Sequence, residues 1–310
     1  MSNVIEVSGL KKSYASRRGP INAVDGLDLS VSSGVVHGFL GANGSGKTTA
    51  IRSLVGQIRE YSGDIRILGE QMPHGLPKVI DRFGALVEAP SFFPNFSGRR
   101  NLELLAKSRG FSKASVVSAL ETVGLTDRAD HRFGTYSLGM KQRLGVAAVL
   151  LKDPELLILD EPANGLDPPG IIAMRTLFRR LASEGRTVFV SSHMLAEVEL
   201  SCDRVTMVAK GRMVQSGSLD ELRSLGESSI EVSVPGGIQE HESAAEVLRQ
   251  AGFGVVHEIE GLKVATTSDR AHELTKLLAD RDIYVSVLRP VIQNLEELFI
   301  GLTSEEAVSQ

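Results

Sequence analysis

The sequence VVHGFLGANGSGKT, at residues 35–48, decides the fold of this 310-residue chain. Its first six residues are an apolar run that predicts a strand, and the next eight fit the pattern G-x-x-x-x-G-K-[ST]. Residues 48–55, which follow, can form a helix. A strand, a glycine-rich loop and a helix in this order predict a loop that binds phosphate groups.

The residue types in this loop explain why it would bind phosphate. Glycines have no Cβ, so successive backbone N–H groups can converge on phosphate oxygens, and the following helix adds partial positive charge at its N-terminus. Lys47 supplies a full charge to the β- and γ-phosphates, and the Thr48 hydroxyl is a ligand for Mg²⁺. We therefore expect a nucleoside triphosphate site formed by Gly41, Asn43, Gly44, Ser45, Gly46, Lys47, Thr48 and Thr49.

A second motif is the run LLILDE at residues 156–161, four apolar residues followed by two carboxylates. Four aliphatic residues in a row are typical of a strand buried on both faces of a parallel sheet, and ligands of such sheets bind outside the carboxyl ends of the strands. We expect Asp160 to hold Mg²⁺, directly or through water, and Glu161 to polarise the attacking water.

Beyond these motifs, the chain alternates strands and helices, which predicts an α/β fold with a parallel sheet. We expect short strands at residues 5–7, 27–31 and 35–40, and a helical region over about 90–151 with helices at 98–109 and 113–123. Residues 156–214 return to strand and helix in turn.

A break near residues 217–229 divides the chain into expected domains 1–225 and 226–310. The last part has the element order of a ferredoxin-like, small α+β domain. It carries no catalytic constellation, and an accessory role is favoured over ligand sensing. Its expected strands lie at 230–234, 254–259, 262–266 and 283–288, and its expected helices at 243–251, 269–280 and 294–302.

Composition narrows the possible partners. The 34 Lys and Arg against 38 Asp and Glu give a net charge of −4 without a basic tract, so we expect no nucleic-acid partner. The single cysteine, Cys202, excludes an intrachain disulfide and fits a reducing compartment. The longest apolar run, Leu144–Leu151, is far shorter than the ~20 residues that cross a bilayer, so any action at a membrane would need a partner.

Six motifs in a fixed order resemble the nucleotide-binding subunits of ABC transporters over about residues 1–225. They are Tyr14 in LKKSY, the phosphate loop, YSLGMKQR at 136–143, the acidic pair, NGLD at 164–167 and His193. The resemblance implies a P-loop cassette with a parallel core sheet, an antiparallel β subdomain and a helical subdomain. It also implies that Tyr14 lies against adenine, that Ser137 and Gly139 of the signature loop touch γ-phosphate, that Asp167 of the D-loop belongs to the nucleotide site, and that His193 contacts γ-phosphate or holds Glu161 and water in line.

Two motifs depart from the family pattern. The signature loop, usually Leu-Ser-Gly-Gly-Gln, has Leu138 and Met140 in place of glycine and glutamine. Glu88 stands at the position of the Q-loop glutamine, where a carboxylate can coordinate Mg²⁺ but cannot donate as an amide does. Both variants, and LEELF at 295–299, resemble the branch that exports bacitracin-like peptides, lantibiotics and anthracycline drugs.

The resemblance implies an ATPase, with ATP and Mg²⁺ as cofactors, that powers a membrane exporter of an antibiotic, peptide or other amphiphilic compound. In the family two cassettes pack head to tail, and each ATP lies between the phosphate loop of one and the signature loop of the other. The implied partners are a second copy of the chain and a separate transmembrane permease. The implied location of the chain is the cytoplasmic side of the membrane. We expect docking through residues 90–100, which include Phe92, Phe93 and Phe96.

An ABC-type ATPase without a transport role is the alternative. Ribosome-acting members typically join two cassettes, whereas this chain has one phosphate loop. Repair members insert a long coiled coil between the two halves, for which residues 49–135 leave little room. A nucleotide-binding scaffold without hydrolysis conflicts with Glu161 and His193.

Overall fold

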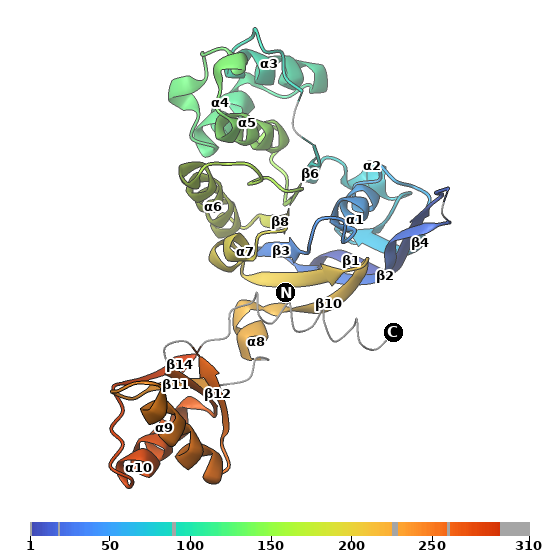
Figure 1. Ribbon diagram of the computed structural model, residues 1–310. Helices are drawn as coiled ribbons and strands as arrows, with labels where there is room; N and C mark the ends of the chain where they lie inside the picture. The colour runs from blue at the N-terminus through green and yellow to red at the C-terminus, as the bar shows by residue number, and fades with distance from the viewer. Residues whose placement is uncertain (1, 18, 89–90, 225–228, 259–260, 292–310) are drawn as a thin grey trace. The chain divides into compact units, whose positions relative to one another are not determined.

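The computed structural model describes residues 2–17, 19–88, 91–224, 229–258 and 261–291 (Figure 1). The chain divides into two compact units, Met1–Leu219 and Asp220–Gln310. The division therefore comes a few residues before the expected boundary at 225, at the start of the short helix α8 (Leu219–Ser224).

A six-stranded sheet with the order β10-β9-β3-β8-β7-β6 forms the centre of the first unit. Five of its strands are parallel, and β10 runs antiparallel to β9 at one edge. The middle strands are buried along their whole length, which is why their sequences are continuous apolar runs. The expected parallel core is confirmed. Its strands are β3 (Val36–Leu40), β6 (Phe83–Leu86), β7 (Leu156–Leu159), β8 (Thr187–Ser192), β9 (Arg204–Ala209) and β10 (Arg212–Ser218).

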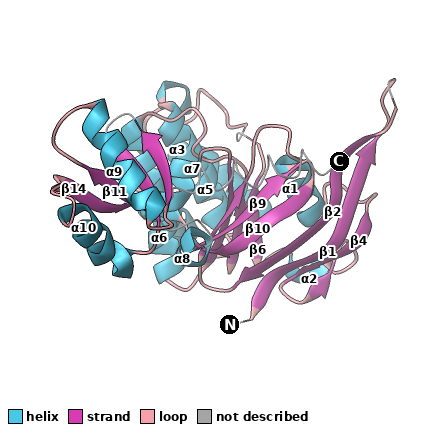
Figure 2. Cartoon of the chain, turned by 60° about the horizontal axis from the view of Figure 1, so that its bottom comes forward, coloured by secondary structure: helices cyan, strands magenta, loops and turns pink. Residues whose placement is uncertain are grey.

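Beside the core sheet lies an antiparallel sheet of β1 (Asn3–Tyr14), β2 (Ile21–Ser32), β4 (Ser62–Ile67) and β5 (Glu70–Gln71), which Figure 2 shows in magenta. The first two strands are twelve residues each, so the expected short strands at 5–7 and 27–31 are wrong in length. Helix α1 (Lys47–Leu54) packs against this sheet, and Ile51 and Leu54 share one hydrophobic core with it. A short helix, α2 (Leu76–Val79), follows β5.

The helical region contains α3 (Gly98–Arg109), α4 (Lys113–Thr122) and α5 (Leu138–Leu150), with 3₁₀ turns at Thr126–Arg128 and Phe133–Thr135. The three helices begin alike, because each follows a serine whose side chain accepts a hydrogen bond from the backbone N–H three residues on. Helix α3 has the predicted bounds, since Ser97 caps its start and Gly110 ends it with a φ of 76°. Within the described ranges, no helix has the length and apolar character that a bilayer crossing requires.

Helices α6 (Pro168–Ser183) and α7 (Leu195–Ser201) pack against β3 and β8 of the core sheet. Each follows the carboxyl end of a core strand, so the loops before them lie at the edge where ligands of parallel sheets bind.

The second unit is a four-stranded antiparallel sheet with the order β12-β13-β11-β14, which is the order of a ferredoxin-like fold. The last strand pairs at 287–291 and not at the expected 283–288, because Ile283 and Val285 pack on the core without joining the sheet. The expected helix 294–302 and the LEELF segment lie outside the described residues. The elements are β11 (Ser229–Ser233), α9 (Ile238–Gln250), β12 (Gly254–Glu258), β13 (Gly261–Ala265), α10 (Ala271–Ala279) and β14 (Val287–Val291).

Candidate functional site

The phosphate loop joins β3 to α1 and lies tightly against neighbouring backbone. Gly46, the residue before α1, has a φ of 103°, and a Cβ there would lie 2.2 Å from the Ala23 carbonyl oxygen. A Cβ on Gly41 would lie 2.4 Å from the carbonyl oxygen of Val208 on β9. Both positions therefore require glycine, and the loop is held in a compact curve by the strands beside it.

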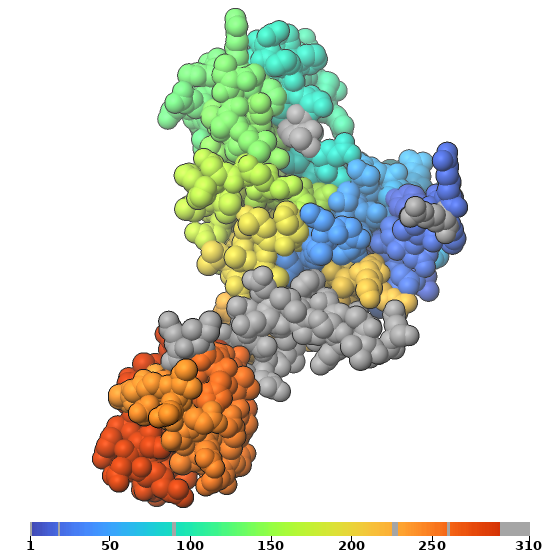
Figure 3. Space-filling model, in the orientation of Figure 1, coloured from blue at the N-terminus to red at the C-terminus, as the bar shows by residue number. Residues whose placement is uncertain are grey.

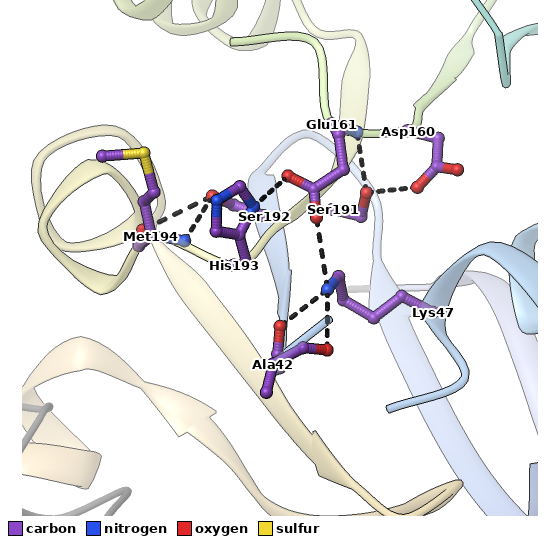
Figure 4. Close-up of polar contacts among 9 residues, drawn as sticks. Ala42, Lys47, Asp160, Glu161, Ser191, Ser192, His193 and Met194 are labelled. Atoms are coloured by element: carbon purple, nitrogen blue, oxygen red, sulfur yellow. Dashed lines mark hydrogen bonds and ion pairs between the residues drawn. The ribbon is translucent and has the colours of Figure 1, made fainter. Parts of the chain in front are cut away.

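Lys47, the first residue of α1, points its ammonium back into this loop. The side chain is 5% exposed, and Nζ donates to the carbonyl oxygens of Gly41 at 2.6 Å and Ala42 at 3.3 Å. Nζ also lies 3.2 Å from Oε1 of Glu161, which follows β7 (Figure 4). The lysine thus links the phosphate loop to the acidic pair.

Glu161 is the residue that joins the parts of the site. Its backbone φ is 48°, in the left-handed region that a residue other than glycine rarely adopts. One carboxylate oxygen contacts Lys47, and the other lies 2.8 Å from Nδ1 of His193, which follows β8 (Figure 4). The structure therefore brings Lys47, Glu161 and His193 together from three separate elements.

Ser191, which the sequence motifs do not single out, connects the two acidic residues. Its hydroxyl donates to Oδ1 of Asp160 at 2.5 Å and accepts from the backbone N–H of Glu161 at 2.8 Å. Strands β7 and β8 are parallel, with Leu159 opposite Val190, so Asp160 and Ser191 come next on the two strands. The polar end of TVFVSS is the one visible signal in the sequence. Its role can be recognised only when β8 is known to lie next to β7.

The remaining residues expected in the first half of the chain lie in the phosphate loop, at the start of α1, at the end of β1 and after β6. Thr48 and Thr49 are the second and third residues of α1, and Asn43 and Gly44 lie in the phosphate loop, while the hydroxyl of Ser45 is buried and, within the described chain, has no hydrogen-bond partner. Tyr14 ends β1 with a 42% exposed ring, 5.3 Å from Nζ of Lys12. Glu88 is exposed and forms an ion pair with Arg52 of α1 at 2.8 Å.

The signature loop and the D-loop form a second group. Ser137 caps α5 by accepting from the Met140 N–H at 3.3 Å, and Asp167 caps α6 by accepting from the Gly170 N–H at 3.2 Å. A Cβ on Gly139 would lie 3.7 Å from the Cα of Gly170, so the first turns of the two helices are in contact. Leu138, which replaces the usual glycine, is 46% exposed and packs beside Gly165.

A cavity of about 140 Å³ lies between α6 and α7, lined by Glu161, His193 and Glu197 among others. Burial raises the pKa of the Glu197 carboxyl, His193 lowers that pKa and Glu161 raises it further. The pair formed by Glu161 and His193 therefore has a second carboxyl group as a neighbour.

Comparison with known proteins identifies the family. Residues 24–164 match the family described as ABC transporter. The bacitracin transport ATP-binding protein BcrA of Bacillus licheniformis is 38% identical, over 97% of this chain and 98% of that protein. The chain belongs to the ATP-binding subunits of ABC transporters. The general activity of this family is ATP hydrolysis coupled to transport.

Two further ABC subunits match a shorter part of the chain. The lantibiotic transport ATP-binding protein SrtF of Streptococcus pyogenes is 34% identical over 72% of this chain and 95% of its own length. The solved structure of an ATP binding subunit of an ABC transporter has a TM-score of 0.61 and 29% identity, and covers 72% of this chain and 92% of that chain. The family, the cassette fold and the drug-exporter branch expected from the motifs are therefore confirmed.

The donors in the site fit a hard cation. Thr48 offers a hydroxyl and Asp160 a carboxylate, and Mg²⁺ prefers such oxygen ligands together with substrate phosphates. No cluster of three or more His, Cys, Asp or Glu suited to a metal occurs in the part of the chain that the structure describes.

Proposed function

We propose that this ABC subunit hydrolyses ATP to power the export of an antibiotic, peptide or other amphiphilic compound through a separate membrane permease. The cargo class is supported by relatives that are named for bacitracin and lantibiotic transport. The hydrolytic role rests on one observation, the Glu161 carboxylate held between Lys47 at 3.2 Å and His193 at 2.8 Å. The proposed place of action is the cytoplasmic face of the membrane, as a peripheral subunit.

In the proposed reaction, each of these three side chains has its own task. Lys47 binds the β- and γ-phosphates, and its ammonium then exchanges its present contacts with Gly41 and Ala42 for phosphate oxygens. Glu161 accepts the proton of the attacking water as general base. His193 keeps the Glu161 carboxylate in line through the contact between Nδ1 and Oε2.

Thr48 and Asp160 are the proposed ligands of Mg²⁺, and Glu88 is a third candidate. The cation would neutralise charge on the phosphates. Asp160 is oriented by the Ser191 hydroxyl, whereas Glu88 already pairs with Arg52. Glu88 would have to leave that exposed ion pair to reach a metal, which costs little because such pairs are weak.

The proposed active form is a head-to-tail dimer of this chain. The first turn of α5 presents backbone N–H groups and the positive end of a helix, and Ser137 and Gly139 lie there. We propose that the γ-phosphate bound by the opposite subunit lies against this turn, with Asp167 nearby. Tyr14, whose ring is exposed, stacks on adenine, and residues 226–310 form an accessory domain.

For the permease, the proposed contact is the segment at residues 90–100. Phe93 is 61% exposed, Phe96 is 41% exposed, and their rings lie 5.3 Å apart. The ring of Phe92 packs edge-on against that of Phe133, with the ring centres 5.2 Å apart, and so anchors the segment to the 3₁₀ turn at Phe133–Thr135. Figure 3 shows the part of the surface that contains this segment in teal, next to the green surface of the helical region. Pro90 lies outside the described residues.

The test of the proposed function is the variant Glu161→Gln. An amide keeps the size of the carboxylate but does not accept the proton, so turnover should fall by about 10²–10⁴ while ATP binding is retained. Glu60→Gln, at a side chain that is 97% exposed, is the matched control and should behave as wild type. Near-normal phosphate release by Glu161→Gln would remove Glu161 from this role.

A further inference from the structure

Ser191 lies where the ends of β7 and β8 meet, and its side chain is completely buried. Its hydroxyl donates its one proton to Oδ1 of Asp160 at 2.5 Å, which leaves its lone pairs to accept from the Glu161 N–H at 2.8 Å (Figure 4). A single hydroxyl thus orients the side chain of one acidic residue and the backbone of the next.

We propose that Ser191 is a positioning residue for hydrolysis, holding Asp160 for the metal and Glu161 for the attacking water. This inference rests on the proposed function, because it assigns Ser191 a task only if the acidic pair performs the chemistry. Among the described residues, the Ser191 hydroxyl bonds to Asp160 and Glu161, and in the proposal it does not touch the nucleotide.

The backbone at Glu161 shows why a support is needed. A φ of 48° is unfavourable for glutamate and persists only where surrounding contacts fix it. The hydrogen bond from the Glu161 N–H to Ser191 is such a contact, and it lies at the base of the side chain that reaches Lys47 and His193. Loss of the serine hydroxyl would let the Glu161 carboxylate move away from both partners.

Ser192 provides a matched control on the same strand end. It is buried like Ser191, with 7% exposure, but among the described residues its hydroxyl bonds to the backbone of Met194, at 3.0 Å from N and 3.4 Å from O (Figure 4). Removing this hydroxyl costs a comparable buried hydrogen bond, and the bond that is lost goes to Met194 and not to Asp160 or Glu161.

The experiment compares Ser191→Ala with Ser192→Ala, Glu161→Gln and the wild-type chain. Phosphate release gives kcat and KM, and a fluorescent ATP analogue gives nucleotide affinity in EDTA and across a Mg²⁺ titration. Ser191→Ala should lower kcat about 10–100-fold and raise the Mg²⁺ midpoint for nucleotide binding, as loss of a residue behind a metal ligand does. Affinity in EDTA should stay within about twofold, since Lys47 and its loop are unchanged.

The outcomes separate the inference from the proposed function. If Ser191→Ala matches Ser192→Ala in kcat and in Mg²⁺ midpoint while Glu161→Gln is inactive, the role of Ser191 is wrong and the proposed function stands. If Glu161→Gln turns over ATP normally, the proposed function itself is wrong. If Ser191→Ala does not fold, Ser191→Cys keeps the volume with a weaker donor and should show the same loss, and normal kcat and Mg²⁺ dependence in it would overturn the inference. Ser191→Thr, which keeps the hydroxyl, should restore most of the activity.

Discussion

At the residue scale, Lys47 and Glu161 each contact more than one partner. Lys47 is almost fully buried, and its ammonium contacts two loop carbonyls and one carboxylate. Glu161 divides its two oxygens between Lys47 and His193. In the proposed reaction, phosphate oxygens would take the Lys47 ammonium and leave Oε1 of Glu161 free to contact water.

His37, on β3, gives a prediction for stability against pH. Its Nε2 lies 2.9 Å from Oγ1 of Thr206, its ring is fully buried, and burial lowers its pKa from 6.5 to about 3, with a smaller contribution from Arg204. The folded chain keeps His37 neutral, while the unfolded chain protonates it below pH 6.5. The free energy of unfolding should therefore fall as the pH drops from 6.5 towards 3, by about 2 kcal/mol at pH 5.

Urea denaturation followed by circular dichroism at pH 7.5 and pH 5 measures this loss. In the variant His37→Gln, which cannot protonate, the decrease between the two pH values should be smaller by about 2 kcal/mol. An identical decrease in the variant and the wild type would show that His37 is not the titrating group.

At the scale of elements, the serine caps of α4 and α5 separate stability from activity. Ser112→Ala and Ser137→Ala each remove a cap, which should lower the free energy of unfolding by ~1 kcal/mol. Only Ser137 lies in the proposed contact with γ-phosphate, so only Ser137→Ala should also lower ATP turnover. Equal ATPase rates in the two variants, measured by phosphate release, would speak against that contact.

Elements were predictable where their ends carried local signals. Ser97 and Gly110 mark both ends of α3, and the glycine pattern of residues 41–48 placed the loop between β3 and α1. The length of β1 was underestimated because its outer face is polar, as the exposed Lys11 illustrates. Ser191 was missed for a different reason, since its task depends on which strand lies next to β7, and no local pattern in the sequence contains the strand order.

At the scale of the whole molecule, Phe93 and Phe92 test the proposed contact with the permease. Phe93→Ala removes an exposed ring and should reduce copurification with the membrane partner while the ATPase rate of the isolated subunit stays unchanged. Phe92→Ala removes packing against Phe133 and should instead lower the thermal stability of the cassette. Undiminished copurification with Phe93→Ala would place the permease on another surface.

The full-length match to BcrA indicates that both units of this chain have a counterpart in a bacitracin transport subunit, whereas SrtF matches 224 residues. The residues that we propose for hydrolysis, by contrast, all belong to the first unit, because Lys47, Ser137, Glu161 and His193 precede residue 219. In the proposed dimer, the signature loop that faces the nucleotide of one subunit comes from the other subunit.

A structure of the Glu161→Gln chain with Mg²⁺, ATP and its membrane partner tests the head-to-tail dimer directly, through the distance from each γ-phosphate to the Ser137 hydroxyl of the opposite subunit. We predict two subunits in which γ-phosphate, held by Lys47 of one copy, lies within hydrogen-bonding distance of Ser137 of the other. ATP bound at Lys47 with Ser137 of both copies facing solvent would contradict it.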